Sequence, residues 1–280
     1  MNKNEYRSDL LLRYNHLHKK RHTMKQKNKF LKTLLIELYE IRSDIKVIES
    51  YMNGNRKVVS RNVYVGDVKK AKTIIATYYD TPSAYFGSYS FVNKNDQQKR
   101  TLQWNLVYSL FITMIGSLFT VFYVMPYSSH NHLSLSLNWI VIGMIYFILF
   151  MILGQTSKGI PTSNNLIRNT SSLIWLIEKI KDNSHDDVAY AFLDSGCTNN
   201  QGLMGLKQSV SKHAIIYHVD CIGSASKIRI FDDQYIEKPM NQITRGVVYI
   251  VASDDDSLDK RQLNATVLNQ DNFDELNKIL

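Results

Sequence analysis

Residues 101–157 contain no Asp, Glu, Lys or Arg, although charged residues make up 21% of the 280-residue chain. Two apolar runs lie in this stretch, at 104–125 and 138–154. A helix rises about 1.5 Å per residue, and the hydrocarbon core of a bilayer is about 30 Å thick. The first run is therefore long enough to span the bilayer. The second run is long enough if its helix begins near residue 136. We therefore predict a transmembrane hairpin at 101–157, with spans at about 104–126 and 136–154. The alternative is a buried helical hairpin of a soluble protein.

The flanks of this stretch predict its orientation. Five basic residues precede or follow it, namely Lys94, Lys99, Arg100, Lys158 and Arg168. The connecting loop at 126–137 has only His130 and His132 as titratable groups. Because Lys and Arg concentrate on the cytoplasmic side of membrane proteins, we expect a multi-pass protein of the cell membrane with its N- and C-terminal parts in the cytoplasm.

The remainder of the chain has the composition of a folded domain. A hydrophobic share of 44%, two Cys and four Pro exclude a disulfide-rich miniprotein, a collagen-like fibre and a disordered chain. Short apolar runs between turns predict strands at 61–65, 73–79, 188–194, 214–220, 227–231 and 246–252. Helical spacing predicts helices at 30–52, ended by a turn at Asn53-Gly54-Asn55, and at 169–181, from 203, and at 273–280. This alternation favours an α/β sheet covered on both faces.

The N-terminal region, 1–57, is predicted to be basic and helical. Its excess positive charge lies in seven side chains: Lys19, Lys20, Arg21, Lys25, Lys27, Lys29 and Lys32. On a membrane-anchored protein such a cluster suits anionic lipid headgroups. Nucleic acid ranks lower as a partner, because a nucleic-acid fold signature is missing from the sequence. A solvated helix face is the third interpretation.

Three predicted strands end in aspartate, at Asp80, Asp194 and Asp220. Ligands of α/β sheets bind at the carboxyl ends of the strands. The three carboxylates are therefore expected to share one rim, where they could hold a divalent metal. The alternative is that each is an ordinary turn-forming residue.

These elements resemble the co-catalytic zinc aminopeptidases, the family of bacterial leucyl aminopeptidase and aminopeptidase Y, which is related to glutaminyl cyclase. The family motif Gly-Ala-His-Tyr-Asp-Ser/Thr aligns with IATYYDT, which places Tyr78 at the histidine and Asp80 at the aspartate. The motif Asn-Asp-Asn-Ala-Ser-Gly aligns with IRNTSS, which places Arg168 at the bridging aspartate. The resemblance covers roughly 58–231.

Two later motifs continue the resemblance. The family segment Phe-Asp-x-Glu-Glu-x-Gly-Leu-x-Gly aligns with FLDSGCTNNQGLMG, with Asp194 retained and Asn199 and Asn200 at the glutamates. The motif Asp-Met-x-Gly aligns with DCIG, which retains Asp220. The resemblance implies a three-layer domain with a mixed central sheet, formed by 58–100 and 158–280 and interrupted by the hairpin.

The departures from the family bear on its chemistry. The family uses two zinc ions, a bridging aspartate and a glutamate base. An arginine in place of the bridging aspartate cannot ligate zinc, because a guanidinium keeps its proton. Only Asp220 would remain as a ligand, so no cofactor is expected. We hypothesise that Arg168 pairs with Asp220, and with Asp80 or Asp194, in place of the metals. The alternative is that Arg168 points to solvent.

The sequence thus predicts a membrane-anchored, catalytically inactive aminopeptidase-like protein. It would bind a peptide or a partner membrane protein as a subunit of a transport, secretion or peptide-maturation complex. The alternative is a membrane-bound metallo-aminopeptidase whose zinc site is rearranged from Asp80, Asp194, Asp220 and the acidic run Asp254–Asp256. A third interpretation is a regulator that acts at the lipid surface through the basic cluster.

Overall fold

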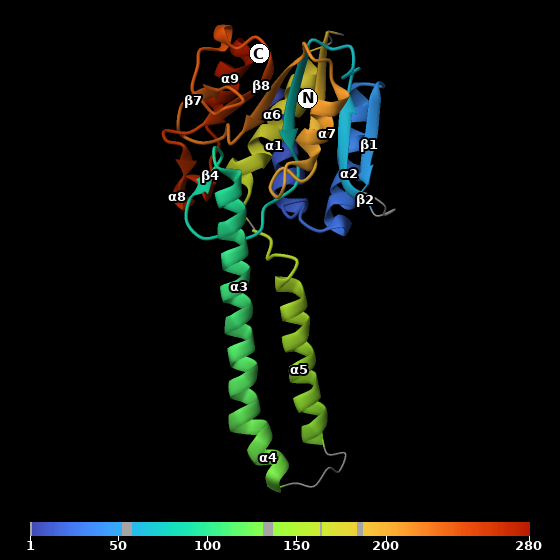
Figure 1. Ribbon diagram of the computed structural model, residues 1–280. Coiled ribbons are helices and arrows are strands. Elements are labelled where there is room, and N and C mark those ends of the chain that lie inside the picture. The colour runs from blue at the N-terminus through green and yellow to red at the C-terminus, as the bar shows by residue number, and fades with distance from the viewer. Residues whose placement is uncertain (1, 52–57, 131–136, 163, 184–186) are drawn as a thin grey trace. The chain divides into compact units, whose positions relative to one another are not determined.

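The computed structural model describes residues 2–51, 58–130, 137–162, 164–183 and 187–280. The chain divides into two compact units. The α/β unit consists of Met1–Pro82, Ser88–Lys94 and Thr162–Leu280, and the hairpin unit consists of Ser83–Gly87 and Asn95–Pro161. Figure 1 labels the helices and strands of both units. The hairpin unit is therefore an insertion in the chain of the α/β unit.

A seven-stranded mixed sheet forms the centre of the α/β unit, in the order β1-β2-β5-β3-β6-β8-β7. The strands β5, β3, β6 and β8 are parallel, whereas β1 pairs antiparallel with β2, β2 with β5, and β7 with β8. The strands are β1 (Ile45–Tyr51), β2 (Val58–Val65), β3 (Thr73–Tyr78), β5 (Val188–Leu193), β6 (Ile215–Asp220), β7 (Ile228–Phe231) and β8 (Gly246–Ala252). Two short strands, β4 (Tyr89–Ser90) and β9 (Ser257–Leu258), pair separately. The predicted mixed sheet and its six predicted strands are confirmed.

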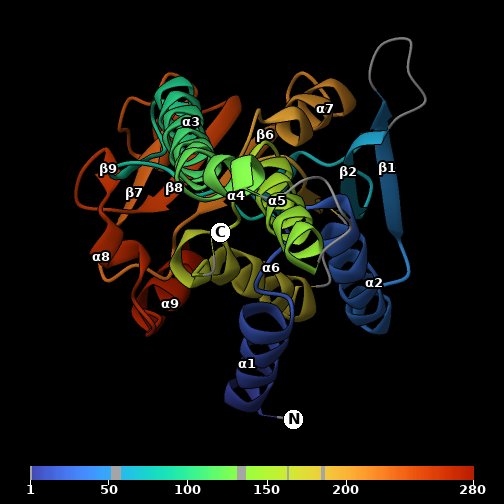
Figure 2. The ribbon, with the colours of Figure 1, turned by 90° about the horizontal axis from the view of Figure 1, so that it is seen from below.

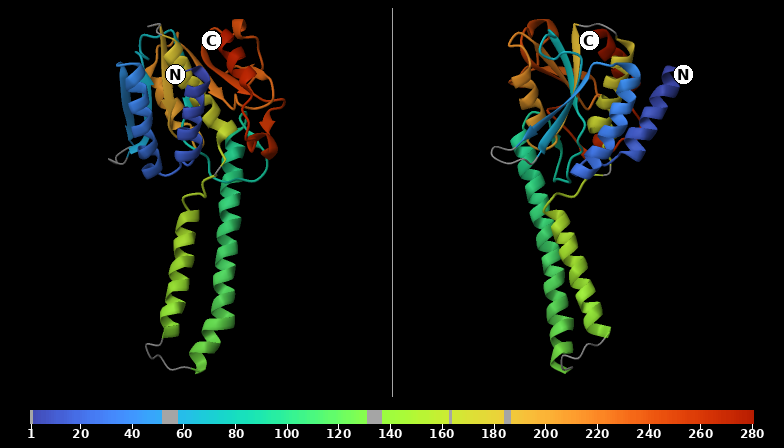
Figure 3. Two further views of the ribbon diagram at one scale, coloured as in Figure 1. Left: turned by 180° about the vertical axis from the view of Figure 1, so that it is seen from behind. Right: turned by 90° about the vertical axis from the view of Figure 1, so that its right-hand side faces the viewer.

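Helices cover both faces of this sheet. Figure 2 and the right-hand view of Figure 3 show α7 on the side of the sheet opposite α1, α2, α6 and α9. The helices of the unit are α1 (Lys3–Leu11), α2 (Met24–Ile41), α6 (Ser171–Asp182), α7 (Gln201–Ser209), α8 (Lys260–Leu263) and α9 (Gln270–Ile279). Short helical turns are η1 (Leu12–Leu17), η3 (Leu166–Thr170) and η4 (Met240–Gln242). The main core, which includes Trp175 of α6, Ile75 of β3 and Phe192 of β5, packs these layers together.

Helix α2 differs from the helix predicted at 30–52. It begins earlier, because the side chain of Thr23 accepts a hydrogen bond from the backbone N–H of Gln26 and caps its first turn. It ends at Ile41, and the following residues form β1 at the edge of the sheet. The prediction failed here because Ile41, Ile45 and Ile48 continued the helical spacing. The turn predicted at Asn53-Gly54-Asn55 lies outside the described residues.

The hairpin unit has two helical arms. One arm comprises α3 (Lys94–Phe119), the π-helical turn η2 (Thr120–Val124) and α4 (Met125–His130), and the other is α5 (Leu137–Thr156). Figures 1 and 3 show the arms side by side. Hydroxyl pairs link them, with 3.1 Å between Ser109 Oγ and Thr156 Oγ1 and 2.5 Å between Thr120 Oγ1 and Tyr146 Oη.

The two arms are long and apolar enough to cross a membrane. The segments Asp96–Ser129 and Leu137–Thr156 each contain an 18-residue stretch with few charges, whose mean hydropathy is 1.9 in the first segment and 2.3 in the second. Large apolar side chains on these arms, such as Phe122, Phe147 and Phe150, are exposed. Residues 131–136, which include His132 of the predicted loop, lie outside the described part of the chain.

Candidate functional site

The three strand-end aspartates lie at one edge of the sheet. The strands β5, β3 and β6 are parallel neighbours, so their carboxyl ends meet there. Asp80 and Asp194 follow β3 and β5, and Asp220 is the last residue of β6. All three are buried, with at most 3% of each residue exposed. They divide into two separate clusters with different partners.

The first cluster surrounds Asp220. The hydroxyl of Tyr78 lies 3.0 and 2.9 Å from the two carboxylate oxygens and donates to them. The hydroxyl of Tyr89, from β4, donates to Oδ2 at 2.7 Å. The thiol of Cys221 lies 3.3 Å from Oδ1. Burial raises the pKa of both phenols well above its usual range, and the carboxylate of Asp220 raises it further, so both hydroxyls keep their protons and donate.

Arg168 belongs to this cluster, which we call the tyrosine–aspartate cluster (Tyr78, Tyr89, Arg168 and Asp220). It lies in η3 with 4% of the residue exposed, so the alternative that it points to solvent is wrong. Its guanidinium carbon lies 3.9 Å from the centre of the Tyr89 ring, a cation–π contact. Its charge lowers the pKa of both phenols against the stronger effect of burial. The guanidinium of Arg168 therefore lies over the ring of Tyr89, whose hydroxyl donates to Asp220.

The second cluster, the lysine–aspartate cluster, comprises Lys27, Asp80 and Asp194. Lys27 Nζ of α2 donates to Asp194 Oδ1 at 2.5 Å. The backbone N–H groups of Arg61 and Ser195 donate to the same carboxylate at 3.1 and 2.7 Å. Asp194 is thus compensated by Lys27, a partner that the sequence did not predict.

Asp80 lies beside this ion pair and is held by the loop after β5. The backbone N–H groups of Gly196 and Cys197 donate to its oxygens at 2.8 and 3.1 Å. Burial raises the pKa of Asp80, and the positive charge of Lys27 partly opposes this. Burial in turn lowers the pKa of Lys27, but the carboxylates of Asp80 and Asp194 outweigh it and raise the pKa overall. The lysine is therefore charged at neutral pH.

Gly196 lies between the two clusters, in close contact with Tyr78. A Cβ atom at this position would lie 2.4 Å from the Cβ of Tyr78, where no side chain fits. The loop can therefore approach Tyr78 and still direct its N–H groups at Asp80. Of the two residues predicted at the glutamate positions, Asn199 is exposed and accepts a hydrogen bond from the N–H of Gln201 at 3.3 Å. Asn200 precedes α7 with a left-handed backbone at φ 57°.

The predicted basic cluster needs correction at two positions. Lys27 is buried in the ion pair, and Arg21 is fully buried. The Arg21 guanidinium donates to the carbonyl oxygens of Tyr79, Tyr14 and His18 at 2.6, 2.9 and 2.7 Å. Burial lowers the pKa of Arg21 to about 10, so it stays charged. Neither side chain can reach a lipid headgroup. The other five members, Lys19, Lys20, Lys25, Lys29 and Lys32, are exposed.

The residues of this edge do not fit a zinc centre. Among the described residues, no three or more His, Cys, Asp or Glu side chains are grouped to hold a metal ion. Zinc sites use thiolate, imidazole and carboxylate ligands, whereas Asp220 is surrounded by two protonated phenols and a guanidinium. Asp254–Asp256 is an exposed run, in which Asp254 Oδ2 accepts a hydrogen bond from Ser226 at 2.8 Å. The structure therefore does not bring together the rearranged metal set.

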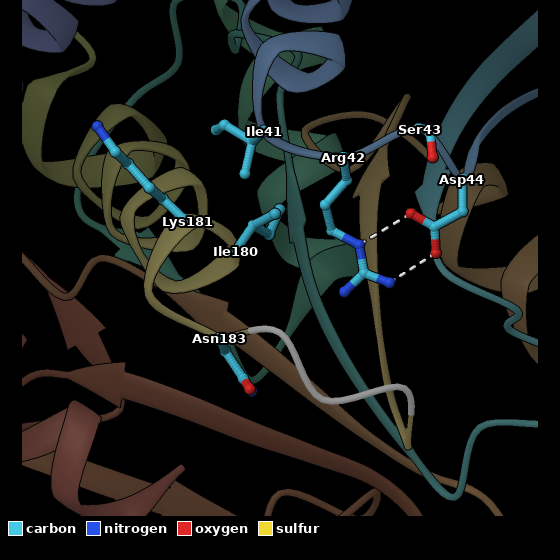
Figure 4. Close-up of a pocket in the computed structure, with 7 residues that line it drawn as sticks. All are labelled: Ile41, Arg42, Ser43, Asp44, Ile180, Lys181 and Asn183. Carbon is cyan, nitrogen blue, oxygen red and sulfur yellow. Dashed lines mark hydrogen bonds and ion pairs between the residues drawn. The ribbon is translucent and has the colours of Figure 1, made fainter.

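A hollow of about 480 Å³ lies at the opposite edge of the sheet, near the beginnings of β1 and β5 (Figure 4). It is lined by Ile41, Arg42, Ser43, Asp44, Ile180, Lys181 and Asn183. The guanidinium of Arg42 forms two hydrogen bonds with Asp44, at 2.8 and 2.6 Å. This hollow contains none of the residues predicted from the sequence.

Two members of the clusters were missed by sequence reasoning. Tyr89 lies in a two-residue strand that has no recognisable pattern. Lys27 had a usable signal, because it shares a helical face with Phe30, Leu31 and Leu34, all buried. A lysine on an otherwise apolar helical face either extends its ammonium group to solvent or pairs with a buried carboxylate, and the three strand-end aspartates were candidates for that pair.

No family model matches the sequence, and no curated protein matches it. Among solved structures, Tannerella forsythia glutaminyl cyclase is similar, with a TM-score of 0.52, 9% identity, and coverage of 98% of this chain and 94% of that chain. A Zn-dependent exopeptidase from Parabacteroides distasonis has a TM-score of 0.48 and 9% identity, and the match covers 96% of this chain and 91% of that chain. Legionella pneumophila LapA aminopeptidase has a TM-score of 0.48 and 9% identity, and the match covers 98% of this chain and 68% of that chain. The fold of this chain is thus similar to that of a solved glutaminyl cyclase, a class to which the family named by the sequence motifs is related.

Proposed function

We propose that this chain is a membrane-anchored, catalytically inactive member of this fold that binds a peptide or a partner membrane protein. The observation that carries the proposal is the tyrosine–aspartate cluster. Asp220, the one family ligand retained in the sequence alignment, is 3% exposed and accepts hydrogen bonds from two phenols.

Hydrolysis on the family plan needs carboxylates that face a metal-bound water. Here the position of the first histidine carries Tyr78, whose hydroxyl binds Asp220. The position of the bridging carboxylate carries Arg168, a fixed positive charge that repels a second cation. Asp194 is neutralised by Lys27. These substitutions satisfy the buried charges without a metal, which supports a binding role over a catalytic one.

The anchor is supported by the hairpin unit. Its two arms have the length and apolarity of membrane spans, and its exposed side chains are those that lipid would cover. On the positive-inside rule, the α/β unit is proposed to lie on the cytoplasmic side. There it would bind a peptide or a partner within a transport, secretion or peptide-maturation complex.

The binding role is proposed for the rim of the same sheet edge. Thr198 and Asn199, in the loop that holds Asp80, are exposed and present polar side chains. A partner could therefore contact this loop without opening the buried clusters beneath it.

The test uses the full chain purified in mild detergent. We expect no stoichiometric zinc, and no turnover of dipeptides or of peptides with N-terminal glutamine. The alternative metallo-aminopeptidase would be established by dipeptide turnover that a chelator stops. The substitution Asp220→Asn should then abolish the turnover, and the exposed control Asp187→Asn should not.

The binding role is tested with a photo-crosslinking amino acid at position 199 in cells, with position 212 at the other end of β6 as the control. A discrete adduct at 199 only is expected, and equal labelling at both positions would contradict the proposal.

A further inference from the structure

We infer that five exposed lysines of the N-terminal region form a surface that binds anionic lipid headgroups. This lysine surface comprises Lys19, Lys20, Lys25, Lys29 and Lys32. Lys25, Lys29 and Lys32 are spaced four and three residues apart along α2, so they lie on one side of the helix. Lys19 and Lys20 lie in the segment just before this helix.

The charge of this surface is uncompensated. Among the described residues, none of the five lysines is in an ion pair. The acidic residue of α2 that faces inward, Glu37, is 3% exposed and is bound by Arg13 and Tyr6. Five positive charges without acidic partners therefore face solvent, where they can attract an anionic surface.

The position of the surface follows from hydrogen bonds within the α/β unit. The backbone N–H of Arg21 donates to Thr81 Oγ1 at 2.8 Å, and the N–H of Thr81 donates to the carbonyl oxygen of Arg21 at 3.1 Å. Asn165 Nδ2 donates to the carbonyl oxygen of Lys19 at 3.1 Å. The segment that carries Lys19 and Lys20 is thus fixed beside Thr81 and Asn165, which flank the insertion of the hairpin unit.

Chain connectivity then limits the distance to a membrane, whatever the orientation of the two units. The second apolar arm ends at Thr156, and the chain rejoins the α/β unit at Thr162. Six residues span at most about 20 Å. Asn165, which binds the backbone of Lys19, therefore lies only a short stretch of chain beyond the second apolar arm, so this end of the lysine surface is tethered to the proposed anchor by a short connection.

Exposed apolar side chains border the lysines and favour lipid over nucleic acid. Leu17 is 70% exposed and Met24 is 37% exposed, and they precede Lys19 and Lys25 in the chain. Leucine beside lysine is the combination that lies in a membrane interface, whereas single-stranded nucleic acid is bound by stacking on aromatic rings.

This inference rests on the proposed membrane anchor, and the test separates the two. The full chain is reconstituted in nanodiscs of phosphatidylcholine alone or with about 30% phosphatidylglycerol, and lysine acetylation is followed residue by residue by mass spectrometry. Acetylation of the five lysines should slow about fivefold in the anionic discs, and salt at about 0.5 M should remove the difference. The exposed lysines Lys46, Lys207, Lys212 and Lys260 serve as internal controls, whose rates should not change.

Equal rates in both kinds of disc would overturn the inference while leaving the anchor intact. Protection by a short RNA but not by phosphatidylglycerol would also overturn it, in favour of nucleic acid. Failure of the chain to enter discs, or its release from cell membranes by alkaline carbonate, would instead refute the anchor. As a second measurement, Lys→Gln at all five positions should lower the phosphatidylglycerol that copurifies in detergent. A control variant with the same loss of charge should keep the wild-type amount of copurifying phosphatidylglycerol. It carries Lys→Gln at Lys46, Lys69, Lys207, Lys212 and Lys260.

Discussion

Asp220 and Asp194 end the two strands that flank β3, but different chemistry surrounds them. Asp220 accepts hydrogen bonds from two neutral phenols, with a guanidinium beyond one of the rings. Asp194 forms an ion pair with Lys27, and Asp80 shares the field of the same ammonium group. The tyrosine–aspartate cluster thus binds its carboxylate through neutral hydroxyl groups, whereas in the lysine–aspartate cluster one ammonium group adds its charge to the backbone N–H donors of two carboxylates. Removal of a single partner should therefore be far more costly in the second cluster.

The largest effect is expected for Lys27→Met. Two buried carboxylates would lose their shared cation, and breaking a buried pair from one side costs about 3–5 kcal/mol. The free energy of unfolding, measured by denaturant titration of the full chain in detergent, should fall by this amount. The neighbouring exposed residue gives the matched control, since Lys29→Met should change it by less than about 0.5 kcal/mol. Similar values for the two variants would remove the distinction between the clusters.

The pH dependence of Lys27→Met follows from the raised pKa of Asp80. When folding raises the pKa of a carboxyl, the free energy of unfolding falls as the pH rises through that pKa. The reason is that burial disfavours the charged carboxylate. Without the lysine this pKa should rise further. The stability deficit of the variant should therefore shrink as the pH is lowered from 7 toward 5, and a deficit that grows on acidification would contradict the assignment.

An intermediate effect is expected for Gly196→Ala, at the position where the loop that binds Asp80 approaches Tyr78. The added methyl group would overlap the Cβ of Tyr78 and displace either that ring or the loop that binds Asp80. Overpacking of this kind costs about 1–3 kcal/mol. The control is Gly205→Ala, where the nearest atoms to an added Cβ are 3.7 and 3.8 Å away. If both variants unfold at the wild-type denaturant midpoint, the contact between loop and ring is not structural.

The smallest effect is expected for Tyr89→Phe. Asp220 would lose its 2.7 Å hydrogen bond but keep the one from Tyr78, so the cost should be about 1 kcal/mol. Denaturant titration should compare the free energy of unfolding of this variant with that of Tyr39→Phe, whose side chain is exposed. The difference between the two variants is the contribution of the buried hydrogen bond. A loss as large as that of Lys27→Met would show that Asp220 also depends on a single partner.

The sequence predicted the parts of this fold that local chemistry determines. The strands β3, β5, β6 and β8 are continuous apolar runs, typical of parallel strands covered on both faces, and their terminal aspartates marked the correct edge of the sheet. The edge strand β1 was missed because its apolar residues continue the helical spacing of the preceding helix, and its largely exposed side chains do not mark a buried face.

The predictions for the site failed where partners come from distant segments. Lys27 reaches Asp194 across 167 residues, and Tyr89 reaches Asp220 across 131. A run of basic residues is typical of a surface, so the burial of Arg21 and Lys27 could not be read from charge alone. We predicted that Arg168 pairs with Asp220 and with Asp80 or Asp194. In the structure Arg168 lies over the ring of Tyr89, and the cation paired with Asp194 is Lys27.

The order of strands in the sheet has a consequence for synthesis of the chain. Both neighbours of β3, which are β5 and β6, are encoded after the hairpin, as is Asp194, the ion-pair partner of Lys27. While the ribosome translates α3 and α5, β3 therefore lacks both of its neighbouring strands, and Lys27 lacks Asp194. Maturation of the α/β unit must therefore wait until both arms have been made, so the nascent protein completes its hairpin before its sheet.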